Sequence, residues 1–234
     1  MLHAVTFDHW GTLVDADHSN KDERIDTLRR YLPEPCNDEI SRAWDVSWAR
    51  FHRILFDGLS PSTPTFLSFV LEELGMALAP EAFEAVVRAW EEAMLDAPPA
   101  LLPGVADVLA EVRSRGLSIG LISDTGVTPG HVLRERLRQI GLLRYFDCLT
   151  FSDEIGVTKT RQYPFCHTAR ALGVAPDEML HVGDLPETDI RGGRAAGCRT
   201  ALLLEVSNRR DGIADADIVL ARLTDLPAAL DDIR

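Results

Sequence analysis

The sequence predicts an α/β protein in which helices cover both faces of a parallel sheet and a helical segment is inserted after the first strand. Three observations predict this fold. Six short apolar runs alternate with helix-like segments, the runs themselves are almost continuously apolar, and residues 22–94 contain helical patterns without a strand pattern. Nearly continuous apolar strands are typical of parallel sheets that are buried on both faces.

The six apolar runs are expected to form the strands of this sheet. They occupy residues 4–7, 118–122, 148–151, 179–182, 200–204 and, weakly, 218–220. Helices are expected at residues 105–115, 132–140, 165–172 and 190–196. Each of these helices is followed by a glycine, which is a common C-cap: Gly116, Gly141, Gly173 and Gly197. Strands and helices in this order predict a Rossmann-like three-layer core.

The inserted segment is expected to form a separate α-helical cap. Amphipathic patterns predict helices at residues 24–31, 40–56, 66–74 and 82–94, and the stretch DAPPALLPG marks the return to the core. We therefore expect residues 1–16 and 99–234 to form the core and residues 17–98 to form the cap. Four aromatic residues at helical spacing are expected to pack between the cap helices: Trp44, Trp48, Phe51 and Phe56.

Composition excludes several classes of partner. The formal net charge of −13 argues against nucleic acid and anionic membranes, because phosphate binding needs clustered basic residues. No apolar run approaches the length of a membrane span. Four scattered cysteines without a CxxC pair are typical of reduced thiols. We expect a cytoplasmic protein with a small-molecule substrate; nothing in the sequence indicates its oligomeric state.

Polar residues follow the predicted strands at the points where the strands end. In open parallel sheets, ligands bind beyond the carboxyl ends of the strands. Each residue alone is ordinary turn chemistry, but together at one sheet edge they predict a site. These residues are Asp8, Ser123, Asp124, Lys159, Asp184 and Asp189.

The chemistry of this set favours a divalent cation and phosphoryl transfer. Gathered carboxylates repel one another, and a small hard cation with oxygen ligands, Mg²⁺, removes that penalty. Asp8 then stays ionised and can attack phosphorus as a nucleophile. Lys159 and the Ser123 hydroxyl are placed to hold phosphoryl oxygens, as are backbone N–H groups after Asp8. Gly11 allows that turn to approach a ligand closely.

Four segments resemble the motifs of the haloacid dehalogenase-like hydrolase superfamily. The stretch FDHWGTLVD is similar to its first motif, LISDTG to the second, VTKTRQYPF to the third and HVGDLPETD to the fourth. The resemblance covers nearly the whole chain, in the family's order. The helical insert after the first motif resembles the small α-helical cap of one large subgroup.

The resemblance implies a role for each matching residue. Asp8 would be the nucleophile and a Mg²⁺ ligand, with the backbone carbonyl of Trp10 and the carboxylate of Asp184 as further ligands. Asp189 would bind the metal through water or support its ligands. Ser123 and Lys159 would grip the transferring group. The residues expected to contact the substrate are Trp10, Gly11, Thr12 and Asp124.

Trp10 departs from the family pattern. Most phosphatases of this superfamily have a second Asp at that position as general acid and base, and an indole cannot transfer a proton at neutral pH. A positioned general acid is worth roughly 10² to 10⁴ in rate. We favour a phosphohydrolase that works without this Asp on good leaving groups, or with water, His9 or a cap residue instead. The indole itself either walls the substrate side or packs under the cap.

Three other functions stay open from the sequence. Haloacid dehalogenases have a Tyr at the position of Trp10 and hold halide with a cation, for which the cap offers Arg42, Arg50 and Arg53. Dehalogenases of that type are metal-free, however, and lack the Gly-Asp with a following Asp. A phosphonatase would need a cap lysine, and only Lys21 lies at the cap's edge. A non-catalytic binding relative is the third alternative.

Overall fold

The computed structural model describes residues 1–15, 20–32, 34 and 36–233. Its centre is a six-stranded sheet with the order β3-β2-β1-β4-β5-β6, in which every neighbouring pair is parallel. The predicted parallel sheet is confirmed. The strands are β1 (Ala4–Phe7), β2 (Ser118–Ser123), β3 (Cys148–Phe151), β4 (Met179–Gly183), β5 (Arg199–Leu203) and β6 (Ile218–Leu220).

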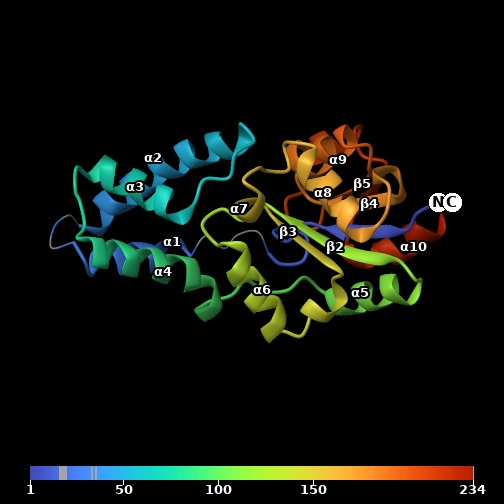
Figure 1. The fold of residues 1–234 in the computed structure, drawn as a ribbon, viewed down its shortest axis with the longest axis horizontal. Helices are drawn as coiled ribbons and strands as arrows, with labels where there is room; N and C mark the ends of the chain where they lie inside the picture. The colour runs from blue at the N-terminus through green and yellow to red at the C-terminus, as the bar shows by residue number, and fades with distance from the viewer. Residues whose placement is uncertain (16–19, 33, 35, 234) are drawn as a thin grey trace.

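Helices cover both faces of the sheet, which gives the predicted three layers (Figure 1). One face packs against α5 (Val105–Ser114), α6 (Gly130–Gln139) and α10 (Leu226–Asp231), and the other against α8 (Tyr163–Leu172) and α9 (Arg191–Ala195). The short helices α7 (Ser152–Ile155) and α10 are additions to the predicted elements. The glycines predicted to end helices all have positive φ, between 71° and 90°.

Four helices form a second body, which we call the helical lobe (Figure 1). They are α1 (Lys21–Arg29), α2 (Asn37–Phe56), α3 (Thr63–Leu74) and α4 (Pro80–Asp96). The lobe has its own apolar cluster, with Trp44, Phe51, Phe66 and Trp90 buried at its centre. The lobe lies at the end of the molecule opposite the two chain termini. The predicted boundary between residues 16 and 17 lies outside the described residues.

The expected aromatic packing holds for part of the stripe on α2. Trp44 and Phe51 are buried in the lobe cluster, and Trp48 is half-buried and stacks on both rings. Phe56 is exposed, so its expected place between helices is wrong. It is the last residue of α2, where the chain leaves the helix pair and turns toward the core.

The lobe contacts the core through the segment after β2. Val127 belongs to this core segment, yet its side chain is buried in the apolar cluster of the lobe. Its carbonyl accepts a hydrogen bond from the Thr63 hydroxyl at 3.3 Å. The buried guanidinium of Arg24 donates to the Thr128 hydroxyl at 3.1 Å. The second sequence motif, LISDTG, is therefore followed directly by a segment that packs against the lobe.

A second contact joins the end of α2 to the loop that carries Lys159. The Thr158 hydroxyl donates to the Leu55 carbonyl at 2.8 Å, and the Ser60 N–H donates to the Gly156 carbonyl at 3.2 Å. We call this contact the α2–loop latch, formed by residues 55–60 and 156–161. It ties the lobe directly to the backbone that presents the ammonium group.

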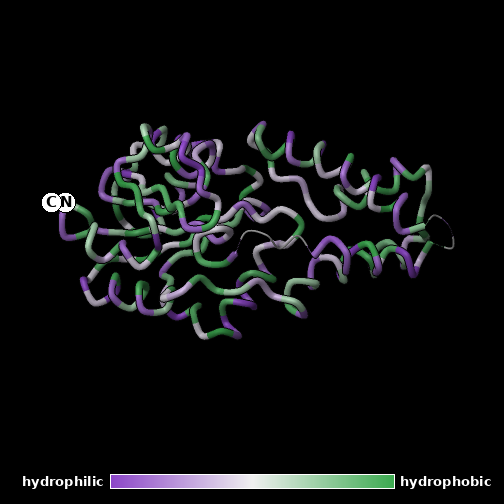
Figure 2. Tube along the Cα trace, turned by 180° about the vertical axis from the view of Figure 1, so that it is seen from behind, coloured by the Kyte–Doolittle hydropathy of each residue, from purple (hydrophilic) through white to green (hydrophobic). Residues whose placement is uncertain are grey.

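The hydropathy of the chain follows these layers. Figure 2 shows hydrophobic and hydrophilic residues alternating along the helices of the core and of the lobe, as expected for helices with one buried face. The strands β1 and β4 are buried along their whole length. Within the described part of the chain, no helix is long and apolar enough to cross a membrane.

Candidate active site

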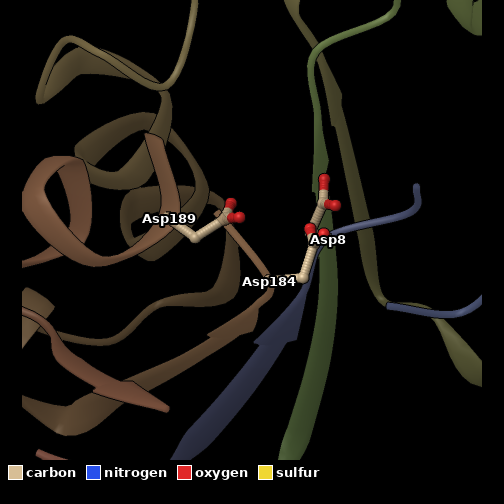
Figure 3. A group of neighbouring side chains, drawn as sticks. All are labelled: Asp8, Asp184 and Asp189. Carbon is tan, nitrogen blue, oxygen red and sulfur yellow. The ribbon is translucent and has the colours of Figure 1, made fainter. Parts of the chain in front are cut away.

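The predicted site residues come together at one edge of the sheet because parallel strands end on the same side. Asp8 directly follows β1, Ser123 is the last residue of β2, and Asp184 directly follows β4. Asp189 lies in the helical turn Pro186–Ile190, and Lys159 lies in the loop between α7 and α8. Figure 3 shows the three aspartates gathered beyond the ends of the strands.

Three buried carboxylates and one buried ammonium group form the centre of the site. One oxygen from each of Asp8, Asp184 and Asp189 lies within 4.8 Å of the others. Lys159 donates from Nζ to Oδ1 of Asp189 at 2.6 Å and also to Oδ1 of Asp8. All four side chains are almost completely buried. The ammonium group therefore bridges two of the three carboxylates.

Burial and mutual repulsion shift the pKa values of these groups. Burial raises the pKa of Asp8, the other two carboxylates raise it further, and Lys159 offsets only part of this. Burial, followed by the charge of Asp189, raises the pKa of Asp184 to about 7. Burial also favours neutral Asp189, but Lys159 and His181 outweigh it and lower that pKa. Burial favours a neutral Lys159 amine, yet the carboxylates raise its pKa.

This arrangement fits a small divalent cation. Within the described structure, Oδ1 of Asp184 is buried without a hydrogen-bond partner, which is unfavourable for a carboxylate oxygen unless a ligand meets it. A cation would also remove the repulsion that raises the pKa values of Asp8 and Asp184. Gly11 makes room beside them: its φ is 71°, and a Cβ there would lie 2.7 Å from Cγ of Asp184.

Asp124 directly follows β2, and its side chain contacts the backbone of the loop that carries Lys159. Its carboxylate oxygens accept the backbone N–H of Lys159 at 3.0 and 3.3 Å. Burial raises the pKa of Asp124 to about 6, although Lys159 lowers it. Ser123 is buried beside it, and its hydroxyl contacts the Asp124 carbonyl at 3.4 Å. The structure thus gives the Asp124 carboxylate a protein partner, whereas the sequence placed it among the substrate contacts.

The turn after Asp8 contains two of the other expected contacts. The N–H of Gly11 donates to the Val14 carbonyl at 2.8 Å, so this N–H serves the turn itself. The hydroxyl of Thr12 is buried, and no atom of the described residues hydrogen bonds to it. Thr12 therefore keeps a polar atom for a ligand, whereas Gly11 contributes the close approach of the turn to Asp184.

Trp10 and His9 pack against each other. Their rings are perpendicular, with centroids 4.8 Å apart, and the half-buried indole of Trp10 packs on the apolar core beneath the sheet edge. His9 is buried, and neither ring nitrogen has a hydrogen-bond partner in the part of the chain that the structure describes. Burial, together with the charge of Lys159, lowers the pKa of His9 to about 3. His9 is therefore neutral at pH 7.

The sequence reasoning missed two residues behind the site, Thr6 and His181. Both are completely buried in the middle of strands. Nε2 of His181 lies 3.1 Å from Oδ1 of Asp189, and its Nδ1 lies 3.0 Å from the Thr6 hydroxyl. A signal for them exists: a Thr and a His interrupt the apolar runs of two adjacent strands, AVTF and MLHVG.

The cations considered for the alternative functions lie on the lobe surface. Arg42, Arg50 and Arg53 are all exposed, and Arg50 pairs with Glu72 at 2.7 Å. Lys21, the cap lysine that a phosphonatase would need, pairs with Asp45 at 2.6 Å. None of these four side chains is buried over the three carboxylates.

The fold and this site define an α/β enzyme with an acidic centre at the carboxyl edge of a parallel sheet. A family model described as haloacid dehalogenase-like hydrolase matches residues 2–197, and the chain belongs to this family. The chain is therefore a hydrolase, and the resemblance noted in its four motifs is confirmed.

Curated relatives and solved structures agree with this assignment. The chain is 29% identical over 208 residues to glyceraldehyde 3-phosphate phosphatase of Methanopyrus kandleri, covering 86% of this chain and 83% of that protein. It is 32% identical over 209 residues to phosphoserine phosphatase of Thermus thermophilus, covering 87% and 81%. The L-2-haloacid dehalogenase structure from Xanthobacter autotrophicus matches with a TM-score of 0.67, 20% identity and full coverage of both chains. At that identity, the structural likeness shows the fold alone.

Proposed function

We propose that the chain is a Mg²⁺-dependent phosphatase that hydrolyses small phosphate monoesters through a phosphoaspartate at Asp8. The observation that carries this proposal is the buried centre itself. Asp8 stands at a strand end beside two further carboxylates and in contact with the ammonium group of Lys159. The phosphatase relatives, which match over four fifths of both chains, support the same reaction class.

The residues that would hold Mg²⁺ are Asp8, Asp184 and the backbone carbonyl of Trp10. When bound there, the ion supplies positive charge that stabilises ionised carboxylates and phosphoryl oxygens. Both oxygens of Asp189 already accept hydrogen bonds from protein donors, from His181 and Lys159 at Oδ1 and from the Leu185 N–H at Oδ2. We therefore assign Asp189 to the support of Lys159 rather than to direct contact with the ion.

The reaction follows in two displacements. A carboxylate oxygen of Asp8 attacks phosphorus, and the ester P–O bond breaks with its electron pair leaving on the alcohol oxygen. Lys159 contacts Asp8 directly, and we assign it, together with the Ser123 and Thr12 hydroxyls, to stabilise the negative charge of the phosphoryl oxygens. Water then attacks the phosphorus of the phosphoaspartate. The bond to Asp8 breaks, and phosphate, a proton and the free carboxylate are released.

Trp10 decides which leaving groups suit this chain. An indole donates no proton to the departing oxygen, and neutral His9 has none to give as an acid at pH 7. The leaving oxygen must therefore take its proton from water or depart as a stable anion. We propose that acyl and aryl phosphates react faster than alkyl phosphates.

Carbon–halogen hydrolysis is the second candidate, because an aromatic residue stands at position 10. Two observations favour phosphate hydrolysis over it. The three lobe arginines suited to halide are exposed. Without a metal ion, three buried carboxylates share the single ammonium group of Lys159. A dehalogenase that works without a metal would have to bear the repulsion between these carboxylates with no gain for its reaction.

The test is phosphate release from a panel of esters and acyl phosphates, with and without Mg²⁺. The panel includes phosphoserine, glyceraldehyde 3-phosphate and phosphoglycolate, the compounds in the names of the relatives. Wild type is compared with Asp8→Asn and with Asp107→Asn, a matched change on the exposed surface of α5. We expect release that needs both Mg²⁺ and Asp8 and is unaffected by Asp107→Asn. Halide release from haloacids that needs Asp8 but not Mg²⁺ would replace this function with the dehalogenase.

A further inference from the structure

A chain of buried hydrogen bonds runs from the middle of the sheet to the nucleophile. The Thr6 hydroxyl in β1 contacts Nδ1 of His181 in β4 at 3.0 Å, and Nε2 of His181 contacts Oδ1 of Asp189 at 3.1 Å. The same oxygen of Asp189 accepts from Lys159 at 2.6 Å, and Lys159 reaches Asp8. Every side chain of this chain is buried.

The partners fix which nitrogen of His181 carries the proton. Asp189 is paired with the Lys159 ammonium group and is ionised, so its oxygens only accept hydrogen bonds. Nε2 of His181 must therefore carry hydrogen and donate to Asp189. A neutral imidazole has one donor and one acceptor, so Nδ1 accepts, and the Thr6 hydroxyl donates to it.

These bonds hold the Asp189 carboxylate in one orientation. Oδ1 accepts from both His181 and Lys159, while Oδ2 accepts the backbone N–H of Leu185 at 2.9 Å. Loss of the His181 donor would leave Oδ1 with Lys159 as its one side-chain partner among the described residues and free the carboxylate to turn. The position of the ammonium group depends on that carboxylate.

We propose that His181 is a positioning residue that acts through Asp189 to hold the Lys159 ammonium group against Asp8. Its effect on turnover rests on the proposed phosphatase function; its effect on Lys159 does not. A role in packing alone is disfavoured by the chemistry of the site. A fully buried imidazole is unfavourable unless its nitrogens are hydrogen bonded, and an apolar side chain would fill the space beside Phe165 without that requirement.

The kinetic test compares His181→Leu with His181→Gln. Leu fills the space but donates nothing, whereas the Gln amide carries N–H near the position of Nε2. We expect Leu to lower kcat at least tenfold, because small displacements of a catalytic group reduce rate strongly, while KM changes by less than about threefold. Gln should restore kcat to within about threefold of wild type. In an Asp189→Asn background, His181→Leu should lower kcat by less than about twofold, because the residue acts through Asp189.

A spectroscopic test is independent of any substrate. The chain has only two lysines, Lys21 and Lys159, so lysine-labelled protein gives two ammonium signals in NMR. The Lys21→Arg variant assigns them. We expect His181→Leu to shift or broaden the Lys159 signal, His181→Gln to preserve it, and the isosteric change Thr6→Val to move it less than Leu does. In wild type, ring ¹⁵N shifts should identify His181, assigned through the Gln variant, as the Nε2–H tautomer.

The outcomes separate the two proposals. If no compound releases phosphate but the Lys159 signal responds to His181→Leu and is preserved by Gln, the phosphatase function fails and the positioning role stands. A His181 ring in the Nδ1–H tautomer overturns the positioning role. So does a Gln variant that falls as far as Leu, since packing would then explain both. If His181→Leu does not fold, the positioning role is still tested by His181→Gln, by Thr6→Val and by the tautomer of His181 in wild type.

Discussion

The carboxylate of Asp124 accepts the backbone N–H of Lys159, with oxygen–nitrogen distances of 3.0 and 3.3 Å. Asp124 follows β2, and Lys159 lies beyond β3, so this contact fastens together two loops that leave neighbouring strands. This contact fixes the backbone of Lys159, while Asp189 and Asp8 fix its ammonium group. The Lys159 side chain is thus held at both ends.

Removing the Asp124 carboxylate should displace Lys159 and slow turnover. We expect Asp124→Ala to lower kcat by at least about tenfold, since the buried N–H of Lys159 loses its acceptor. Asp124→Asn keeps one acceptor oxygen and should lose less. Steady-state kinetics measure both. A matched control is Asp147→Ala, which removes the acceptor of the Ile119 N–H at the opposite end of β2. It should reduce stability and leave kcat unchanged; equal losses of kcat would contradict the assignment.

Gly11→Ala should weaken Mg²⁺ binding. Its φ of 71° strains an alanine by about 1 to 2 kcal/mol, and the new Cβ would push against Asp184. Gly116→Ala is the control, because its φ is 75° and nothing lies within 4 Å of a Cβ there. We expect both variants to lose unfolding free energy in urea, with Gly11→Ala losing at least as much as Gly116→Ala because of the added contact with Asp184. Only Gly11→Ala should bind Mg²⁺ at least about tenfold more weakly, measured by calorimetry. Equal Mg²⁺ affinities in the two variants would exclude the clash with Asp184.

Trp10→Asp should restore a general acid. We expect turnover of alkyl phosphates to rise roughly tenfold or more, because an alkoxide leaves poorly without a proton. Aryl and acyl phosphates should gain less, since their leaving groups are stable anions. The ratio of kcat values on the two substrate types measures the effect. Equal gains on both types would show that the substitution acts by opening space instead.

Cys198 should resist alkylation in the folded protein across pH 7 to 9. Burial, followed by the nearby Cys166 and Asp177, raises the pKa of its thiol to about 12, and only the thiolate reacts. The thiol therefore stays protonated until the pH is far above this range. Cys36 is exposed and should react with iodoacetamide at pH 8. Peptide mass spectrometry compares the two sites, and urea should abolish the difference. Equal labelling of both in native protein would be inconsistent with the buried position.

The sheet was predictable because its strands are almost continuously apolar, as strands that are buried on both faces of a sheet must be. The predicted lobe helices started two or three residues late, at Arg24 for the helix that begins at Lys21. Periodicity begins with the first buried residue, whereas the first turn also includes exposed residues such as Asp22 and Glu23. The strand-end carboxylates were predictable for a similar reason, since each follows its strand directly in sequence.

Contacts between distant segments were not predictable from local patterns. The sequence placed Asp124 among the substrate contacts, and only the fold brings its carboxylate to the backbone N–H of Lys159. Thr6 and His181 lie 175 positions apart and meet because β1 pairs with β4. His9 lies in the loop directly after a strand, where residues are often exposed, yet it is buried and packs against Trp10. A pairing that depends on topology leaves no periodic trace in the residues themselves.

The α2–loop latch has a consequence for how this enzyme can be altered. Thr158, one residue before Lys159, is hydrogen bonded to the end of α2. A change in the lobe segment 55–60 therefore reaches the ammonium group through two residues of backbone. Lobe variants selected for higher affinity toward a new substrate should therefore also change the turnover of the original substrate. This should hold even for substrates too small to contact the lobe.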